Sequence, residues 1–136
     1  MLEHSANPIK ALRAWGRVLK PGGSLILLLP DKQWTFDHRR SVTMLEHLIA
    51  DFEADTGEND LKHLAEILNL HDLARDKAAG TYEMFRARSE RNFENRCLHH
   101  HVFNAPLVQQ MLEYAGFVVQ TVEEHFQHHI VAIAER

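Results

Sequence analysis

The fold is decided by the stretch Arg17-Val18-Leu19-Lys20-Pro21-Gly22-Gly23-Ser24-Leu25-Ile26-Leu27-Leu28-Leu29-Pro30. Its centre, Pro21-Gly22-Gly23, is a strong stop signal for a preceding helix. The apolar run that follows does not alternate with polar residues. A short continuous apolar segment between turn residues is typical of a strand buried on both faces, as in a parallel sheet. We therefore predict a helix, a tight turn and a buried strand, which make half of an α/β unit.

The helix before this turn has a clear beginning. Asn7 can cap a helix, and Pro8 is tolerated at the first helical position. Apolar residues then recur at spacings of three and four, which marks one buried helical face: Ile9, Leu12, Trp15, Val18 and Leu19.

The middle of the chain, residues 31–101, is polar, charged and predicted to be mainly helical. One amphipathic helix is indicated by Leu45, Leu48, Ile49 and Phe52, and a second by Leu61, Leu64, Ile67 and Leu68. A third helix is predicted from about Tyr82 to Asn95. Gly57 and Gly80 separate these patterns and mark loops.

The last third returns to an α/β pattern. Asn104 can cap a helix that Gly116 closes, and its apolar face carries Leu107, Val108, Met111, Leu112 and Ala115. Two strands follow, at Phe117-Val118-Val119 and at Ile130-Val131-Ala132-Ile133. We expect them to pair as an antiparallel edge, with Glu124 to Gln127 in the connection.

Composition excludes several classes of protein. The 136 residues include 45% hydrophobic and 25% charged residues, which are ordinary globular values. A net charge of -4 gives no general basic field for nucleic acid. The longest apolar run is far shorter than the roughly 20 residues of a membrane helix, and Glu3, His4 and Asn7 interrupt any signal-peptide pattern. Cys97 is alone, so no intrachain disulfide or cysteine zinc cluster is possible, and a cytoplasmic setting is expected.

Two blocks of the sequence resemble the class I S-adenosylmethionine-dependent methyltransferases. The first runs from Leu2-Glu3-His4 through Asn7-Pro8 and Ala11-Leu12 to Arg17–Pro30, and is similar to the family's "LEH…P…AL…RVLKPGG.L.L..P" segment. The second, His101 to Val119, is similar to its "H.F…L..LL..AGF.V" segment. The type 11 members found beside glycan-synthesis enzymes resemble the chain most. Their "TFDHRR..T..EHL..D" and "CLHHHVF" stretches match Thr35 to Asp51 and Cys97 to Phe103.

The resemblance implies a partial Rossmann-like methyltransferase sheet of about three strands, the family's last three, with a helical insert after the first of them. The terminal strand would then lie beside Leu25–Leu29, with Phe117–Gln120 outside it. All of residues 1–136 would form one truncated methyltransferase-like domain. Residues 1–30 give the helix and buried strand, 31–101 the insert, and 102–136 the helix and terminal strand pair.

The cofactor half of that domain has no counterpart in this sequence. In the family, S-adenosylmethionine is held by a glycine-rich turn after the first strand and by an acidic residue at the end of the second. The glycines here form no G-x-G motif, and Gly22-Gly23 precedes a strand, whereas a cofactor cradle follows one. We therefore expect this chain to lack a complete cofactor site and to be inactive in isolation.

The resemblance and the position of charged residues give the candidate site. The family's counterpart of His4 faces the methyl end of the cofactor, so His4 is the candidate general base; its other interpretation is a polar residue before the helix. The loop after the first strand lies where the ligand crevice of an α/β sheet opens, so its charged residues are candidate acceptor contacts: Lys32, Asp37, His38, Arg39 and Arg40. The paired arginines could grip a phosphate or carboxylate, unless this is simply a solvated loop.

The triple histidine His99-His100-His101 has two interpretations. Alternating residues of a strand share a face, so His99 and His101 could converge, with His38, His47 or His71 completing a metal site. No H-E-x-x-H helix or matching carboxylate spacing supports metal binding, and we predict none. We expect His99 and His101 to line a polar pocket for a hydroxylated acceptor such as a sugar, or else to anchor the insert to the sheet. Cys97 is predicted to be structural, and His125, His128 and His129 to lie on the surface.

An unpaired edge at Leu25–Leu29 would be a template for another chain, so a homodimer through this edge or face is expected. Three functions remain open at this point: a methyltransferase for a small or sugar-like acceptor, a non-catalytic self-associating module, or one half of a split enzyme.

Overall fold

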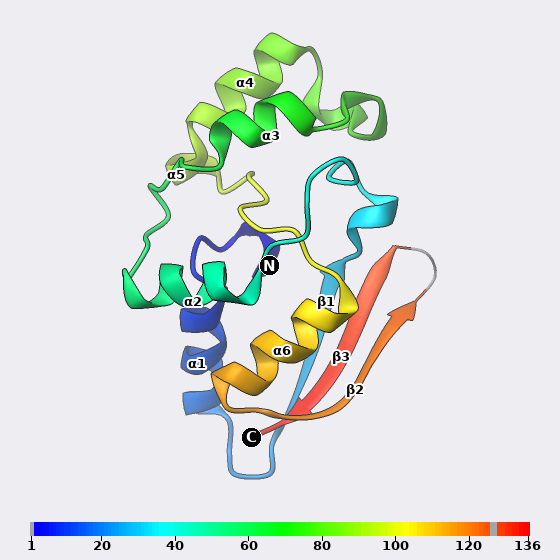
Figure 1. Ribbon diagram of the computed structural model, residues 1–136. Helices are drawn as coiled ribbons and strands as arrows, with labels where there is room; N and C mark the ends of the chain where they lie inside the picture. The colour runs from blue at the N-terminus through cyan, green and yellow to red at the C-terminus, as the bar shows by residue number, and fades with distance from the viewer. Residues whose placement is uncertain (1, 126–127) are drawn as a thin grey trace.

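Three strands form one sheet in the order β1-β3-β2. The computed structural model describes residues 2–125 and 128–136. Strand β3 (His129–Glu135) lies between β1 (Ser24–Pro30) and β2 (Val118–His125) and is antiparallel to both, so β1 and β2 run in the same direction (Figure 1). The sequence predicted three strands, the antiparallel terminal pair and this order, and all three are confirmed. Strand β2 continues to His125, so Glu124 lies in the strand and not in the connection; residues 126 and 127 lie outside the described residues.

The described helices follow the predicted pattern closely. Asn7 caps α1 (Pro8–Val18) by accepting from the backbone N–H of Lys10, and Gly116 closes α6 (Ala105–Ala115) with a φ of 98°. The insert contains α2 (Leu45–Glu53), α3 (Leu64–Leu70), α4 (Tyr82–Glu90) and α5 (Asn92–Asn95). The predicted third helix is thus divided near Arg91. Short 3₁₀ turns lie at Leu2–His4, Lys32–Trp34, Leu73–Arg75 and Lys77–Ala79. None of the described helices is long and apolar enough to cross a membrane.

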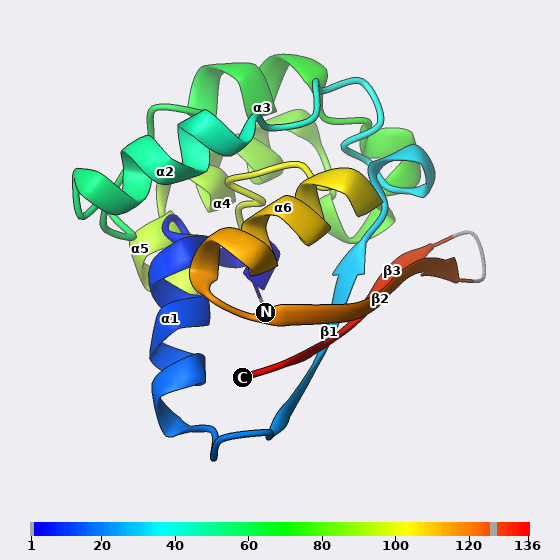
Figure 2. The ribbon, with the colours of Figure 1, turned by 60° about the horizontal axis from the view of Figure 1, so that its bottom comes forward.

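The prediction that β1 is buried on both faces was wrong. Leu27 and Leu29 are buried, but Ile26 and Leu28 are 64% and 51% exposed on the other face. The cause is the arrangement of the helices: α1 and α6 pack together on one side of the sheet, and Figure 2 shows the helices gathered on that side. β1 is also not part of a parallel pair, because its one described partner is the antiparallel β3.

The insert is divided between two cores. Leu48 of α2 is fully buried in the main core with Leu12, Leu112 and Ile130. The rest of the insert has its own smaller core, formed by Ile67, Ala79, Phe85 and Leu98. Helices α3 and α4 therefore stand beyond the carboxyl end of β1, and α2 connects them to the sheet (Figure 1).

Candidate functional site: two histidine clusters

The three consecutive histidines point to three different surroundings. Residues 96–100 have no regular secondary structure, so the alternation expected of a strand does not hold. His99 bonds to Asp37, His100 contacts Asn92, and His101 contacts the backbone of Ala6. His99 and His101 therefore belong to separate hydrogen-bonded clusters, although both line one small cavity beside Asp37. The prediction that they line a pocket for an acceptor stays a prediction.

The first cluster joins His4, His99 and Asp37 near the carboxyl end of β1. The His4 and His99 rings are 4.7 Å apart in an edge-to-face arrangement. His99 Nδ1 lies 2.7 Å from Asp37 Oδ2, and His4 Nδ1 lies 3.1 Å from the carbonyl oxygen of Leu98. Carbonyl and carboxylate oxygens only accept, so both Nδ1 atoms carry a proton, and in a neutral imidazole the Nε2 atom then keeps a lone pair. Two residues selected separately from the sequence, His4 and His99, are thus neighbours.

The electrostatics of this first cluster favour a neutral His4 and an ionised Asp37. Burial, followed by the charge on His99, lowers the pKa of His4, so its imidazole is neutral near pH 7. Burial alone would raise the pKa of Asp37, but hydrogen bonds from His99 and Arg40 hold it below its ordinary value. An ionised Asp37 behind His99 orients the ring and can stabilise its protonated form, which is the arrangement of a carboxylate–histidine pair in acid–base catalysis.

Arg39 and Arg40 do not form a paired grip on an anion. Arg40 is 2% exposed and donates to Asp37, to Glu66 and to the carbonyl oxygens of His99 and His100. Its guanidinium therefore fastens the histidine segment to the loop after β1. Arg39 has a half-exposed side chain that pairs with Asp72 at 3.2 Å. His38 also bonds to Asp72, at 2.9 Å. Of this group, His38 and Arg39 keep surface that an acceptor could contact.

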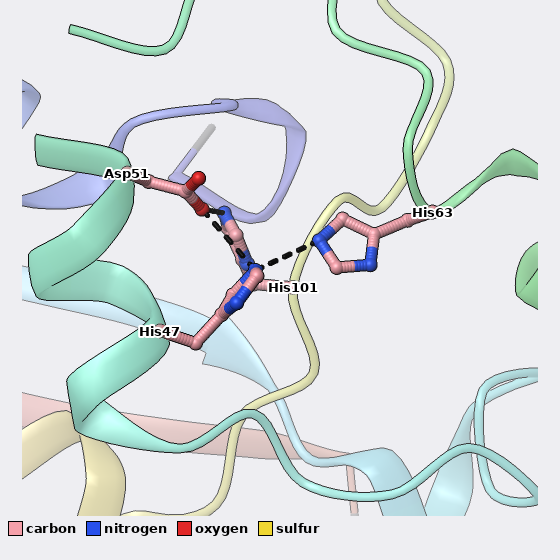
Figure 3. A group of neighbouring side chains, drawn as sticks. All are labelled: His47, Asp51, His63 and His101. Carbon is pink, nitrogen blue, oxygen red and sulfur yellow. Dashed lines mark hydrogen bonds and ion pairs between the residues drawn. The ribbon is translucent and has the colours of Figure 1, made fainter. Parts of the chain in front are cut away.

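The second cluster contains His47, Asp51, His63 and His101 (Figure 3). One ligand-type atom from each of these residues lies within 4.8 Å of every other. His47 and Asp51 are one turn apart on α2, His63 precedes α3, and His101 leads into α6. Burial lowers the pKa of His63, and it lowers that of His101 to about 3, so both imidazoles are neutral near pH 7. The cluster thus gathers three imidazoles and a carboxylate from three separate segments.

Sequence reasoning missed Asp51 and His63 as site residues. His47-x-x-x-Asp51 has the spacing that places two ligands on one face of a helix, and that signal was present in the sequence. His47 and His101 were both named as possible partners, but no pattern in the sequence indicates that His63 approaches them. Comparison of the chain with protein-family models, with curated proteins and with solved structures finds no match.

Cys97 and the three histidines of the terminal hairpin lie outside both clusters. Cys97 is a half-buried free thiol whose Sγ contacts the carbonyl oxygen of Arg88, and burial raises its pKa. His125, His128 and His129 are exposed on the terminal hairpin, as predicted.

Proposed function

We propose that this chain is the acceptor-binding part of an S-adenosylmethionine-dependent methyltransferase domain acting on a hydroxylated, sugar-like acceptor. The observation that carries the proposal is the meeting of His4 with the His99–Asp37 pair next to the end of β1. Methyl transfer to a hydroxyl needs the donor and acceptor aligned and a group that removes the hydroxyl proton. A neutral imidazole with a free Nε2 lone pair supplies that second requirement.

The sheet supports the same proposal. Its order, with an antiparallel strand between two that run in the same direction, agrees with the resemblance seen in the sequence motifs. Sheets of the doubly wound class carry helices on both faces. Here α1 and α6 cover one face, and the opposite face keeps Ile26 and Leu28 exposed. A second layer and the strands that hold the cofactor would complete the domain from outside these residues.

In this proposal each residue of the first cluster has one task. His99 accepts the acceptor's hydroxyl proton at Nε2 as the methyl group is transferred, and Asp37 holds its Nδ1 proton and stabilises the imidazolium. His4 lies against the His99 ring and offers its own Nε2 as a second acceptor of a substrate hydroxyl. His38 and Arg39, at the outer side of the loop after β1, would contact the rest of the acceptor.

Cofactor binding tests the proposal. Titration of this chain alone with S-adenosylmethionine should give no saturable binding, because the glycine-rich turn is absent. A chimera with the cofactor-binding strands of a complete type 11 methyltransferase placed before residue 2 should bind one equivalent and methylate a sugar hydroxyl. Saturable binding by the chain alone, or a folded chimera that binds no cofactor, would contradict the proposal.

The role of His99 is tested in the same chimera. His99→Gln should lower kcat by about 100-fold, the typical contribution of a general base, and leave cofactor affinity unchanged. His128→Gln, on the exposed hairpin, is the matched control and should leave kcat unchanged. Equal activity of the two variants would remove His99 from the mechanism.

A second candidate function is a self-associating module, and the exposed side chains of β1 favour it. The apolar face formed by Ile26, Leu28, Val131 and Ile133 has no helix over it in the described structure, and β1 pairs along one edge with β3. A second copy could cover either the face or the edge. Light scattering after size exclusion should then give a dimer that Leu28→Asp dissociates, whereas a folded monomer at micromolar concentration would contradict self-association.

A further inference from the structure

We infer that His47, Asp51, His63 and His101 form a structural binding site for one zinc-like divalent transition metal ion. Three imidazoles and one carboxylate are a ligand set that zinc accepts, and four protein ligands are typical of structural rather than catalytic zinc sites. The inference concerns a site separate from the proposed acceptor site, and it does not depend on methyltransferase activity.

The distances inside the cluster agree with tetrahedral coordination. Metal–ligand bonds of about 2.0–2.1 Å place the ligand atoms of a tetrahedron about 3.3–3.4 Å apart. His47 Nε2 lies 3.3 Å from Asp51 Oδ2, and His101 Nε2 lies 3.5 Å from the same oxygen. The His47 and His63 Nε2 atoms are 2.9 Å apart. Small side-chain shifts would therefore bring all four groups around one ion.

Hydrogen bonding within the protein does not satisfy these groups. A single hydrogen on His47 Nε2 can serve His63 or Asp51, but not both. If the hydrogen is instead on His63 Nε2, His47 Nε2 is the acceptor and Asp51 Oδ2 receives no hydrogen from His47. Asp51 Oδ2 and His101 Nδ1 are indeed buried with no hydrogen-bond partner in the described structure. Both side chains are at most 2% exposed, so bulk water does not solvate them. A cation removes the conflict at Asp51 Oδ2, because this oxygen and the imidazole Nε2 atoms can each give it a lone pair at once. To join them, His101 Nε2 gives up its contact with the carbonyl oxygen of Ala6, and the imidazole proton moves to Nδ1.

The surroundings hold Asp51 in place for this role. Its other oxygen, Oδ1, accepts from the Thr56 hydroxyl at 3.1 Å and from the Lys62 ammonium. Lys62 is also 3.4 Å from Asp60 Oδ2 and its side chain is 40% exposed, so a second carboxylate and water offset its charge. Hydrogen bonds that orient a ligand in this way are characteristic of metal sites.

The ion would link three parts of the fold. His47 and Asp51 belong to α2 in the main core, His63 begins the outer half of the insert, and His101 ends the segment that returns from it. Metal binding therefore joins α3 and α4 to the sheet and stabilises the folded state, since the unfolded chain has no such arrangement of ligands.

The test uses the untagged chain, freed of metal with a chelator and then titrated with Zn²⁺ by calorimetry. One equivalent should bind, and free zinc at 100 times Kd should raise the folding equilibrium constant about 100-fold. Co²⁺ should give the intense visible absorption of tetrahedral coordination. Absence of one-to-one binding, or a weak octahedral Co²⁺ spectrum, would overturn the inference.

Two variants locate the ion. His63→Gln removes a ligand whose side chain is 19% exposed and should weaken zinc binding by at least about 100-fold, the upper end of the effect of losing an outer-shell partner. His4→Gln is the matched control, because His4 belongs to the neighbouring group of Glu3, His4 and His99. It should leave the zinc affinity unchanged. A loss in His4→Gln with none in His63→Gln would place the ion in the other group and overturn the assignment.

Discussion

Replacing Arg40 by methionine tests whether this side chain anchors the fold instead of binding an acceptor. Arg40 is 2% exposed and uses four of its five N–H groups on Asp37, Glu66 and two backbone carbonyls. Methionine keeps much of the side chain's bulk but leaves Asp37, which is 3% exposed, without its guanidinium partner. Removing one partner of a buried ion pair costs about 3–5 kcal/mol of unfolding free energy.

Urea denaturation followed by circular dichroism measures this loss. With a slope of about 2 kcal/mol/M, a loss of about 4 kcal/mol lowers the urea midpoint by about 2 M. The neighbouring substitution Arg39→Met is the control. Its side chain is half exposed and makes one ion pair with Asp72, which is worth about 0–1 kcal/mol.

A double-mutant cycle separates the ion pair from the rest of the site. Asp37→Asn and Arg40→Met together should cost less than the sum of the single variants, because each single variant strands the other's buried group. If Arg40→Met lies within about 1 kcal/mol of Arg39→Met, the anchoring role derived from burial is refuted. If the variant does not fold at all, Arg40→Lys, which keeps the charge but not the fork of donors, should show an intermediate loss.

Three further substitutions test the local structure by the same urea assay. Asn104→Ala should lower the free energy of unfolding by about 1 kcal/mol, because its side chain caps a helix. Asn7→Ala should lower it by about 2 kcal/mol, because Asn7 caps a helix and also donates to the buried carbonyl of Asp51. Equal losses would contradict a stabilising role for the Asn7–Asp51 hydrogen bond. Gly116→Ala should cost about 1–2 kcal/mol through its φ of 98° alone, since a methyl group there meets no atom within 4 Å, and Gly116→Asn should cost less. Burial holds the pKa of His71 below its ordinary value in the folded chain. As the pH falls, His71 is therefore protonated in the unfolded chain at a higher pH than in the folded chain. In the presence of chelator, the free energy of unfolding should therefore fall as the pH drops below about 6.5, and this group contributes up to about 1.4 kcal/mol per pH unit. His71→Gln should flatten that slope. Parallel pH profiles of the two proteins would contradict this role of His71.

Local signals in the sequence were sufficient for most elements. Asn7, Asn104 and Gly116 cap or close helices through contacts within a few residues, so their effect is independent of the rest of the fold. The apolar run after Gly23 correctly predicted a strand, because such a run is compatible with few other short structures. It could not predict that one face stays open. The exposure of that face depends on how many helices pack over the sheet, and the sequence of a single strand carries no information about this.

The candidate sites depended on tertiary structure to a greater degree. His4 and His99 were both selected from the sequence, but their contact arises because the insert returns its last segment beside the first turn of the chain. The charge of Arg40 and its position in a loop suggested that it could contact a ligand. The structure shows it buried, because other segments of the chain pack over it, and the local sequence does not indicate this. His63 carries no signal in its own neighbourhood.

The sequence by itself determined most helices and strands, because capping, turn geometry and apolar periodicity act over a few residues. Only the tertiary structure decided which of the histidines meet. Residues 47, 63 and 101 are separated by long stretches of chain, and their approach is set by the packing of α2 against the core and by the path of the insert. Long-range packing also decided that β1 keeps one exposed face, because helices cover only the other side of the sheet.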